Sequence, residues 1–310
     1  MFGKFMNNYY YGKSGKGDYT KDDLPTNRWQ LFWEMLRTRL SGLCRLNLMY
    51  MLIWLPTMIV LMVGVTSIFS TLMTEDGELV ENAGVLLESI VQGTLLLLIP
   101  CIAITGIATP GVAYVTRNWS RDEHAFIWSD FKDAVKANWK QSLPISLITG
   151  FLPIAVYVGW TFYGDMSVSS AVMVIPQVLV LMVGIMWSLA VTYMHPLIVS
   201  YKLRFRDVIR NAFILAVARL PMSVGIRLLH CVPVVIAVAL AMVVNPVYCM
   251  LGLFAYYVLF GFALSRFITA SFTNAVFDKY INSRIEGATV NRGLNTDVDD
   301  DDYDEEEEQE

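Results

Sequence analysis

The chain contains little charge, few cysteines and few histidines for its length. Only 16% of its 310 residues are charged, whereas about a quarter of a soluble domain is charged. Its four cysteines show no C-x-x-C spacing and no matched histidines, which excludes a recognisable zinc site or disulfide framework; they are Cys44, Cys101, Cys231 and Cys249. No Gly-x-Ser-x-Gly elbow and no histidine–carboxylate pair at catalytic spacing is present. We therefore predict no enzyme activity, no metal or cofactor site and no nucleic-acid partner.

Long apolar runs are what the chain has in abundance, and its mean hydropathy is +0.48. A helix needs about 20 mostly apolar residues to cross the hydrocarbon core of a bilayer. Six runs meet that length, at residues 46–73, 85–115, 142–163, 171–200, 223–244 and 247–272. Because these runs lack the alternation of a β-strand, we predict an all-α fold, a polytopic transmembrane helical bundle with six spanning helices.

Basic residues fall in alternate connections between these runs. Residues 1–45, 117–141, 201–222 and 273–310 carry Lys and Arg, whereas residues 74–84 and 164–170 carry none. Loops rich in Lys and Arg stay on the cytoplasmic side of a membrane. We therefore predict a multi-pass protein of the bacterial cytoplasmic membrane with both termini cytoplasmic: an N-terminal segment at 1–45, a six-helix domain at 46–272 and a C-terminal segment at 273–310.

The C-terminal segment ends in a run of acidic residues. Eleven of the 28 acidic residues lie between Asp297 and Glu310, so the rest of the chain carries a net positive charge despite the acidic pI. A run of like charge is expected to stay disordered and extended. It is interpreted either as a solubilising end or as a lure for a basic partner.

Three basic segments show helical amphipathicity and are predicted to be cytoplasmic amphipathic helices. Before the first span, Trp29, Phe32, Trp33 and Leu36 recur at helical spacing, which suits a helix lying in the headgroup region or one packed on the protein's own cytoplasmic side. In the third basic connection, residues 201–220, the apolar part is too short to span, which predicts an interfacial or re-entrant helix.

The connection from Arg117 to Gln141 is the most organised of the polar stretches. Its aromatic and apolar residues recur at helical steps, opposite a set of charged side chains. Clustered exposed aromatic residues mark a partner or membrane contact. The hypothesis is a partner-binding surface formed by Trp128, Phe131, Val135 and Trp139; the alternative is an interfacial helix that only closes the bundle.

Ionisable residues within spans are costly and are functional hypotheses by default. The intramembrane polar candidates are Glu88, His195, Arg227 and His230. Arg266, close to the cytoplasmic edge of the last span, is a further candidate. Arg227 and His230 are three residues apart and share a helix face. For the glutamate and the two arginines, the alternative is that each side chain extends to the membrane surface.

Small and hydroxyl residues repeat every four positions in the last span, at Gly261, Ser265, Thr269 and Thr273. Such a row lets two helices approach closely. It predicts a helix-packing seam, within one chain, in a homodimer or with a different partner, so the oligomeric state stays open.

Several stretches together resemble the YesL-like family of bacterial integral membrane proteins, whose domain is of unknown function. They are Met1–Phe5, Arg45–Leu48, Leu55–Pro56, Thr105–Thr109, Ala113–Tyr114, Arg121–Glu123, Asp130–Phe131, Asn138–Gln141 and Asn211. The resemblance implies a multi-helix membrane protein linked to carbohydrate ABC importer loci. It carries over no catalytic residue.

The sequence therefore supports a leading hypothesis and two alternatives. The leading hypothesis is an accessory subunit, or an assembly or regulatory factor, associated with a carbohydrate ABC importer whose subunits would be its partners, beside the lipid bilayer. The first alternative is a self-sufficient small-solute transporter or channel with a midplane site lined by aromatic residues, namely Trp160, Trp187, Tyr193, Tyr256 and Tyr257. The second is a membrane scaffold without a transport role.

Overall fold

The computed structural model describes residues 24–72 and 80–295. Every regular element in these ranges is helical, and six helices are long and apolar enough to cross a membrane. The predicted all-α, six-span architecture is thereby confirmed. Three predicted features lie outside the described residues: the first basic residues of the chain, most of the acidic connection 74–84 and the acidic run 297–310.

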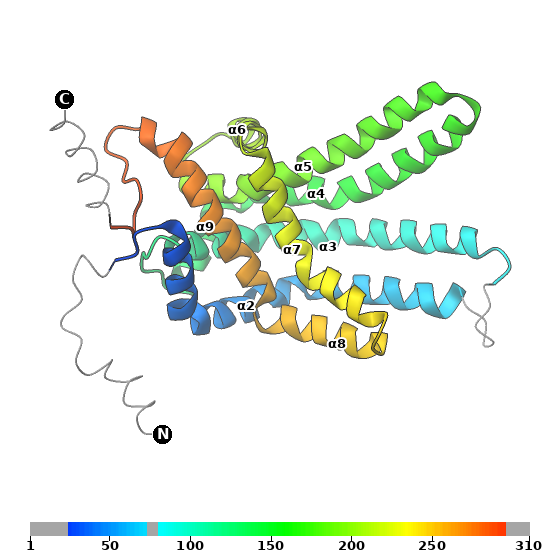
Figure 1. Ribbon diagram of the computed structural model, residues 1–310, viewed down its shortest axis with the longest axis horizontal. Helices are drawn as coiled ribbons and strands as arrows, with labels where there is room; N and C mark the ends of the chain where they lie inside the picture. Colours follow the sequence, from blue (N-terminus) through cyan, green and yellow to red (C-terminus); the bar gives the residue numbers. More distant parts are fainter. Residues whose placement is uncertain (1–23, 73–79, 296–310) are drawn as a thin grey trace, which may run out of the picture.

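The helices follow one another with short connections (Figure 1). In chain order they are α2 (Arg28–Leu72), α3 (Ala83–Trp119), α4 (Ser129–Ser169), η2 (Ala171–Met173), α5 (Val174–Ser200), α6 (Phe205–Ala218), α7 (Leu220–Ala241), α8 (Pro246–Tyr256), η3 (Tyr257–Gly261), α9 (Phe262–Tyr280) and η4 (Asn282–Arg284). Helices α2 to α5 lie lengthwise across Figure 1, and α6 is seen nearly end-on above them.

Two of the predicted amphipathic segments are continuous with spans. Helix α2 runs without a break from Arg28 through the first apolar run, and α4 runs from Ser129 through the third. Gly42 of α2 allows a close approach to the Trp119 ring of α3, because an added Cβ would lie 3.0 Å from that ring. The third amphipathic segment forms the separate helix α6, and the next helix begins just before Pro221.

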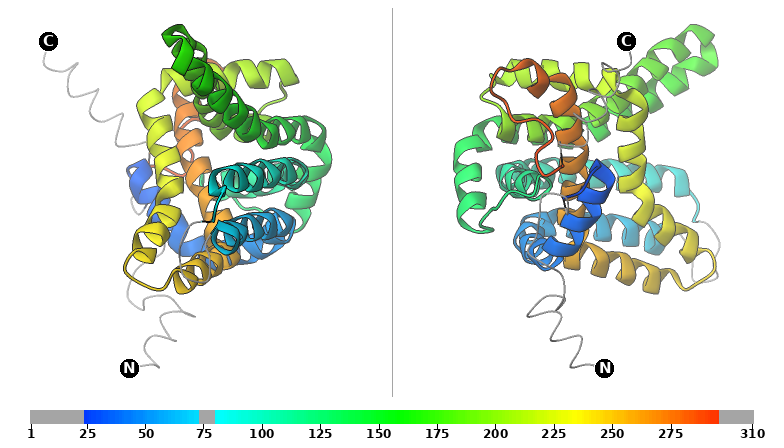
Figure 2. Two further views of the ribbon diagram at one scale, coloured as in Figure 1. Left: turned by 90° about the vertical axis from the view of Figure 1, so that its right-hand side faces the viewer. Right: turned by 60° about the vertical axis from the view of Figure 1, so that its left-hand side comes forward.

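The packed core is concentrated in one half of the bundle. One cluster joins α2, α3 and the start of α9 around Leu46, Val112 and Phe267. The other joins α5, α6 and the end of α9 around Tyr193, Leu197 and Phe277. Helix α9 therefore connects the two clusters, and it crosses between the groups of helices in both views of Figure 2.

The connections between helices lie at two ends of the bundle. We call "basic end" the end that carries connections 120–128 and 201–204 and residues 281–295, and "far end" the end that carries residues 80–82, 170–173 and 242–245. The described chain starts and finishes at the basic end, at the left of Figure 1. There the backbone amide of Asn295 donates to the carbonyl of Pro25 at 3.0 Å.

Candidate functional site

The first turns of α4 place the predicted partner-binding residues at the basic end, but on different faces. Trp128 is 66% exposed, and Trp139 is also exposed. Phe131 instead points inward against Gly111 of α3, where an added Cβ would lie 2.5 Å from the ring. Val135 is half-buried. The four residues therefore do not form one continuous exposed surface.

A further exposed aromatic side chain lies in the connection that leads into α4. Phe126 is 64% exposed, and its ring is 4.5 Å from that of His124. Its backbone amide donates to the Asp130 carboxylate at 2.8 Å, which holds the connection against the helix start. Phe126 and Trp128 together form the exposed pair that we call the aromatic edge. Phe126 was not among the residues grouped by helical spacing, and it lies three positions before α4 begins.

A groove of about 800 Å³ lies between the start of α4 and the end of α5. Asp130, Asp133 and Asn138 line it from α4, whereas Lys202 and Arg204 line it from the connection 201–204. Gln141 donates to the Leu203 carbonyl at 3.0 Å and ties the two walls together. The groove therefore presents acidic groups on one wall and basic groups on the other.

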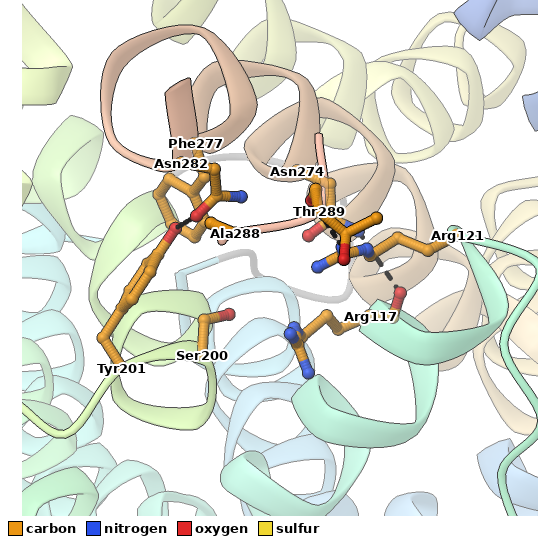
Figure 3. A pocket seen from close by; sticks show the side chains of 9 residues that line it. All are labelled: Arg117, Arg121, Ser200, Tyr201, Asn274, Phe277, Asn282, Ala288 and Thr289. Atoms are coloured by element: carbon orange, nitrogen blue, oxygen red, sulfur yellow. Dashed lines mark hydrogen bonds between the residues drawn. The ribbon is translucent and has the colours of Figure 1, made fainter. Parts of the chain in front are cut away.

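A second cavity, of about 170 Å³, lies beside the groove and shares Ser200 and Tyr201 with it. We call it the arginine pocket. Figure 3 shows the guanidinium groups of Arg117, from the end of α3, and Arg121, from the connection that follows, directed into the cavity opposite residues of α5, α9 and the C-terminal loop. The main polar residues of its lining are Arg117, Arg121, Ser200, Tyr201, Asn274 and Thr289.

A chain of hydrogen bonds holds the wall opposite the arginines. The Tyr201 hydroxyl donates to Asn282 at 2.7 Å, and the Asn282 amide donates to Asp278 at 2.6 Å. Asp278 in turn forms an ion pair with Arg28 and accepts the Asn291 backbone amide at 3.2 Å. Burial, followed by the negative charge of Asp278, raises the pKa of Tyr201 to about 12. Tyr201 therefore remains a neutral donor at physiological pH.

The guanidinium groups of Arg117 and Arg121 use only part of their hydrogen-bonding capacity. The Arg117 guanidinium donates to Asn118 at 3.2 Å, and Arg121 donates weakly to the Thr289 carbonyl at 3.4 Å. Within the described residues, the Nε atoms of both arginines and the hydroxyl of Ser200 are buried without a hydrogen-bond partner. Unmet donors on buried cations are costly, so the pocket is suited to accepting a negatively charged group.

His195, on α5, lies in the core of the spans and is 2% exposed. The Val191 carbonyl lies beside the ring, but neither ring nitrogen attains hydrogen-bond geometry with any described residue. Arg227 and Arg266 are close enough to interact with the imidazole electrostatically. The charged side chains nearest to His195 are therefore both cationic.

Arg227 and His230 each contact the backbone of a neighbouring helix. Arg227 donates from Nε to the Ser188 carbonyl of α5 at 2.7 Å. His230 lies 2.9 Å from the Ser265 carbonyl of α9, and the Thr269 hydroxyl lies 3.4 Å from the same ring nitrogen. These contacts join α7 to α5 and α9. Glu88 lies apart from them, exposed near the far end of α3, where it accepts from Gln92 at 2.9 Å.

The predicted packing seam runs from the end of η3 along α9, and its hydroxyls donate mainly to carbonyls of their own helix. Ser265, Thr269 and Thr273 each donate to the carbonyl four residues earlier, at 2.8 Å. Thr269 and Thr273 are buried, and Gly261 packs against the rings of Tyr256 and Tyr257. The seam contributes close packing inside the chain.

Asn47 performs a role that the seam pattern did not reveal. Where η3 interrupts the regular helix between α8 and α9, the Asn47 amide donates to the carbonyls of Tyr257 and Val258, at 2.9 and 2.7 Å. Its side-chain oxygen accepts the amide of Ala263 at 2.9 Å. A single α2 side chain thus satisfies the backbone groups that the irregular turn leaves free.

Comparison with known proteins gives one finding. Residues 43–160 match the family model described as "Protein of unknown function, DUF624". The matched segment runs from α2 to α4 and includes Asn47, Arg117 and Arg121. No curated protein and no solved structure matches the chain.

Proposed function

We propose that this multi-span protein is an accessory subunit, or an assembly or regulatory factor, of a larger membrane complex, and that its partner docks at the basic end. The observation that carries the proposal is the aromatic edge, Phe126 and Trp128, exposed beside a groove with oppositely charged walls. Exposed apolar side chains along the spans are expected to face lipid. The aromatic edge lies in a connection between spans, where exposed aromatic rings favour a partner contact.

The partner class that we propose is the membrane subunit of a carbohydrate ABC importer in the bacterial cytoplasmic membrane. The DUF624 description names no activity. Support for this partner class therefore comes from the resemblance to the YesL-like family. The groove adds chemical support, since its acidic and basic walls suit a polar protein segment that carries both charges. Aromatic anchors beside such a groove are typical of the residues that dominate binding energy.

The proposal places the basic end in the cytoplasm, because Lys and Arg are retained on that side. Lys132 and Arg204 are suitable reporters at the basic end. In a variant without native cysteines, we expect Lys132→Cys and Arg204→Cys to react with a membrane-impermeant maleimide only after the cells are opened. Labelling of either cysteine in intact cells would reverse the orientation and remove the cytoplasmic docking site.

Co-purification tests the partner directly. After cross-linking in the host membrane, the wild-type chain should retain importer membrane subunits, identified by mass spectrometry, and a Phe126→Ala/Trp128→Ala variant should retain at least tenfold less. Trp160→Ala is the matched control, because Trp160 is an exposed tryptophan within the span of α4, the helix that follows the aromatic edge. Equal recovery from the three proteins, with sugar uptake intact in a deletion strain, would contradict the proposal.

A self-sufficient transporter is the second candidate, and the buried His195 with the half-buried Arg227 and His230 favours it as a polar intramembrane site. The aromatic residues predicted for such a site do not converge: Trp160 is exposed, whereas Tyr193 is buried and paired with Ser223 at 2.7 Å. Flux of a labelled solute into liposomes that contain only this protein would establish transport. Loss of partner localisation with unchanged uptake would instead indicate a scaffold.

A further inference from the structure

The ion pairs around the arginine pocket leave an excess of positive charge. Asp278 is paired with Arg28. Glu123 is shared, at 3.4 Å from Arg121 and 3.1 Å from Arg292. Arg117 has no ion pair within the described part of the chain, yet it lies close enough to Arg121 for mutual repulsion. Glu123 therefore pairs with two arginines and acts on Arg117 only at longer range, and a bound anion would relieve the excess positive charge.

The free donors surround the cavity from two helices. Arg117 approaches from the end of α3, Arg121 approaches from the connection just after it, and the Ser200 hydroxyl approaches from the end of α5 (Figure 3). The Nε atom of Arg117 and the Ser200 hydroxyl are buried and unpartnered, whereas the Nε atom of Arg121 lies 3.4 Å from Glu123 without forming a hydrogen bond. Arg121 is 7% exposed as a whole residue, so its charge is held inside the protein. Donors that converge from different sides match an acceptor with several oxygens.

We propose that the arginine pocket binds a phosphoryl group. Two guanidinium groups supply the forked donors that recognise phosphate oxygens, and Ser200 supplies a third direction, which suits a tetrahedral group better than a planar carboxylate. A volume of about 170 Å³ corresponds to roughly five or six water-sized units, which leaves room for the phosphoryl group and a small substituent. This site is distinct from the aromatic edge, and it does not depend on the identity of the docking partner.

The phosphoryl group has two sources that share this chemistry. The pocket lies where α3 and α5 end, at the level where a lipid headgroup would enter, and it also adjoins the groove through Ser200 and Tyr201. A soluble phosphate would enter through the groove. Membrane composition separates the two sources, because a lipid ligand is present only in bilayers that contain the anionic lipid.

The first experiment measures binding to the full chain in phosphatidylcholine nanodiscs, with inorganic phosphate as probe and chloride as ionic-strength control. We expect phosphate to raise the unfolding temperature, and Arg117→Gln to weaken phosphate binding at least tenfold. Arg117→Lys keeps the charge without the fork and should give an intermediate loss. Arg206→Gln is the matched control, because Arg206 is exposed on α6 and does not line the cavity; its affinity should stay within twofold of wild type.

A second set of nanodiscs, with phosphatidylglycerol added, identifies the source. Competition between this lipid and free phosphate, lost in Arg117→Gln, would assign the site to a lipid headgroup. Unchanged phosphate affinity would assign it to a soluble phosphate. Either result supports the proposal.

A measurement on the wild-type protein keeps the proposal falsifiable if the arginine variants do not fold. Phenylglyoxal modifies free guanidinium groups, and peptide mass spectrometry locates the modified residues. Phosphate, or the anionic lipid, should slow modification of Arg117 and Arg121 at least fivefold and leave modification of Arg206 unchanged. The proposal is overturned by equal protection of all three arginines, by no protection, or by wild-type phosphate affinity in a folded Arg117→Gln protein.

Discussion

The two halves of the bundle are built on different principles. In the half next to the basic end, α3 buries side chains from Leu98 to Trp119, and α5 buries those from Leu189 to Ile198. In the far half, α7 buries only Ser223 and α8 buries no residue. The far half must therefore satisfy its apolar surface with lipid, whereas the basic half satisfies its own surface by packing and hydrogen bonding.

Contacts in the far half are correspondingly sparse and depend on small residues. Helices α4 and α5 approach at Gly159 and Gly184, which face Val180 and Val156. This hairpin extends away from α2 and α3 at the upper right of Figure 1. Apolar helices of similar hydropathy therefore form a protein core in the basic half and a lipid-facing surface in the far half. Paired substitutions in the two halves test that difference.

The largest effect is expected from Asn47→Ala. This change leaves the carbonyls of Tyr257 and Val258 and the amide of Ala263 buried without a partner, which should lower the free energy of unfolding by about 3 kcal/mol. Asn245→Ala, in the far half, removes an exposed helix cap and should cost about 1 kcal/mol. Denaturant unfolding in detergent measures both. Equal losses would mean that the two halves are not distinct.

The next effect compares two glycines of α3. A Cβ at Gly106 would lie 2.6 Å from the Cβ of Ser146 and 2.9 Å from the Ser142 carbonyl oxygen, so Gly106→Ala should destabilise the protein by about 2 kcal/mol. At Gly93, in the far half, an added Cβ meets nothing within 4 Å. Gly93→Ala should therefore be neutral or stabilising by up to about 1 kcal/mol. A large loss at Gly93 would show that the far half packs against another chain.

A smaller effect, of opposite sign, is expected at His195. Its ring nitrogens are buried without hydrogen-bond partners, so His195→Leu should stabilise the fold by about 1 to 2 kcal/mol. Thermal unfolding in nanodiscs checks this. Destabilisation instead would show that the imidazole has a partner, such as an ordered water.

The smallest effect is expected from Tyr201→Phe. Loss of the hydrogen bond to Asn282 should lower stability by about 0.5 to 1 kcal/mol at pH 8. The pKa of Tyr201 is raised from 10.0 to about 12, so its contribution is complete below pH 10 and is lost as the pH rises from 10 to 12. Unfolding measured across that range should show the wild-type advantage shrinking. An advantage that grows with pH would have the wrong sign.

The spans could be predicted from sequence because hydropathy and length are local properties. Residues 171–200 were predicted as a span, and η2 with α5 occupies the same residues. The sixth run was also located, but its irregular turn at Tyr257–Gly261 was not, because that turn depends on Asn47, more than 200 residues away.

The inward face of α4 shows the limit of periodicity. Helical spacing grouped Phe131 with Trp139, but it could not determine which side would meet α3. Gly111 of α3 determines which face of α4 turns inward, because it provides the space that the Phe131 ring fills. The α4 face was therefore assigned by a residue in another helix.

The arginine pocket was beyond sequence reasoning for a similar reason. Arg117 and Arg121 were visible as part of a basic connection, but their counterparts come from distant positions. Ser200 lies at the end of α5, and Asn274 and Thr289 lie near the end of the chain. Only the packing of α9 between the two clusters brings these groups to one cavity.

The pairing of Arg28 with Asp278 has a consequence for biosynthesis. These residues are separated by 250 positions, so the ion pair can form only after a segment synthesised much later than α2 has emerged. Until α9 is made, the pocket lacks Asn274 and Phe277, and α2 lacks Asp278 as a partner. The basic end is therefore completed only after α9 has been synthesised, and a chain truncated before α9 would insert its earlier spans without this junction.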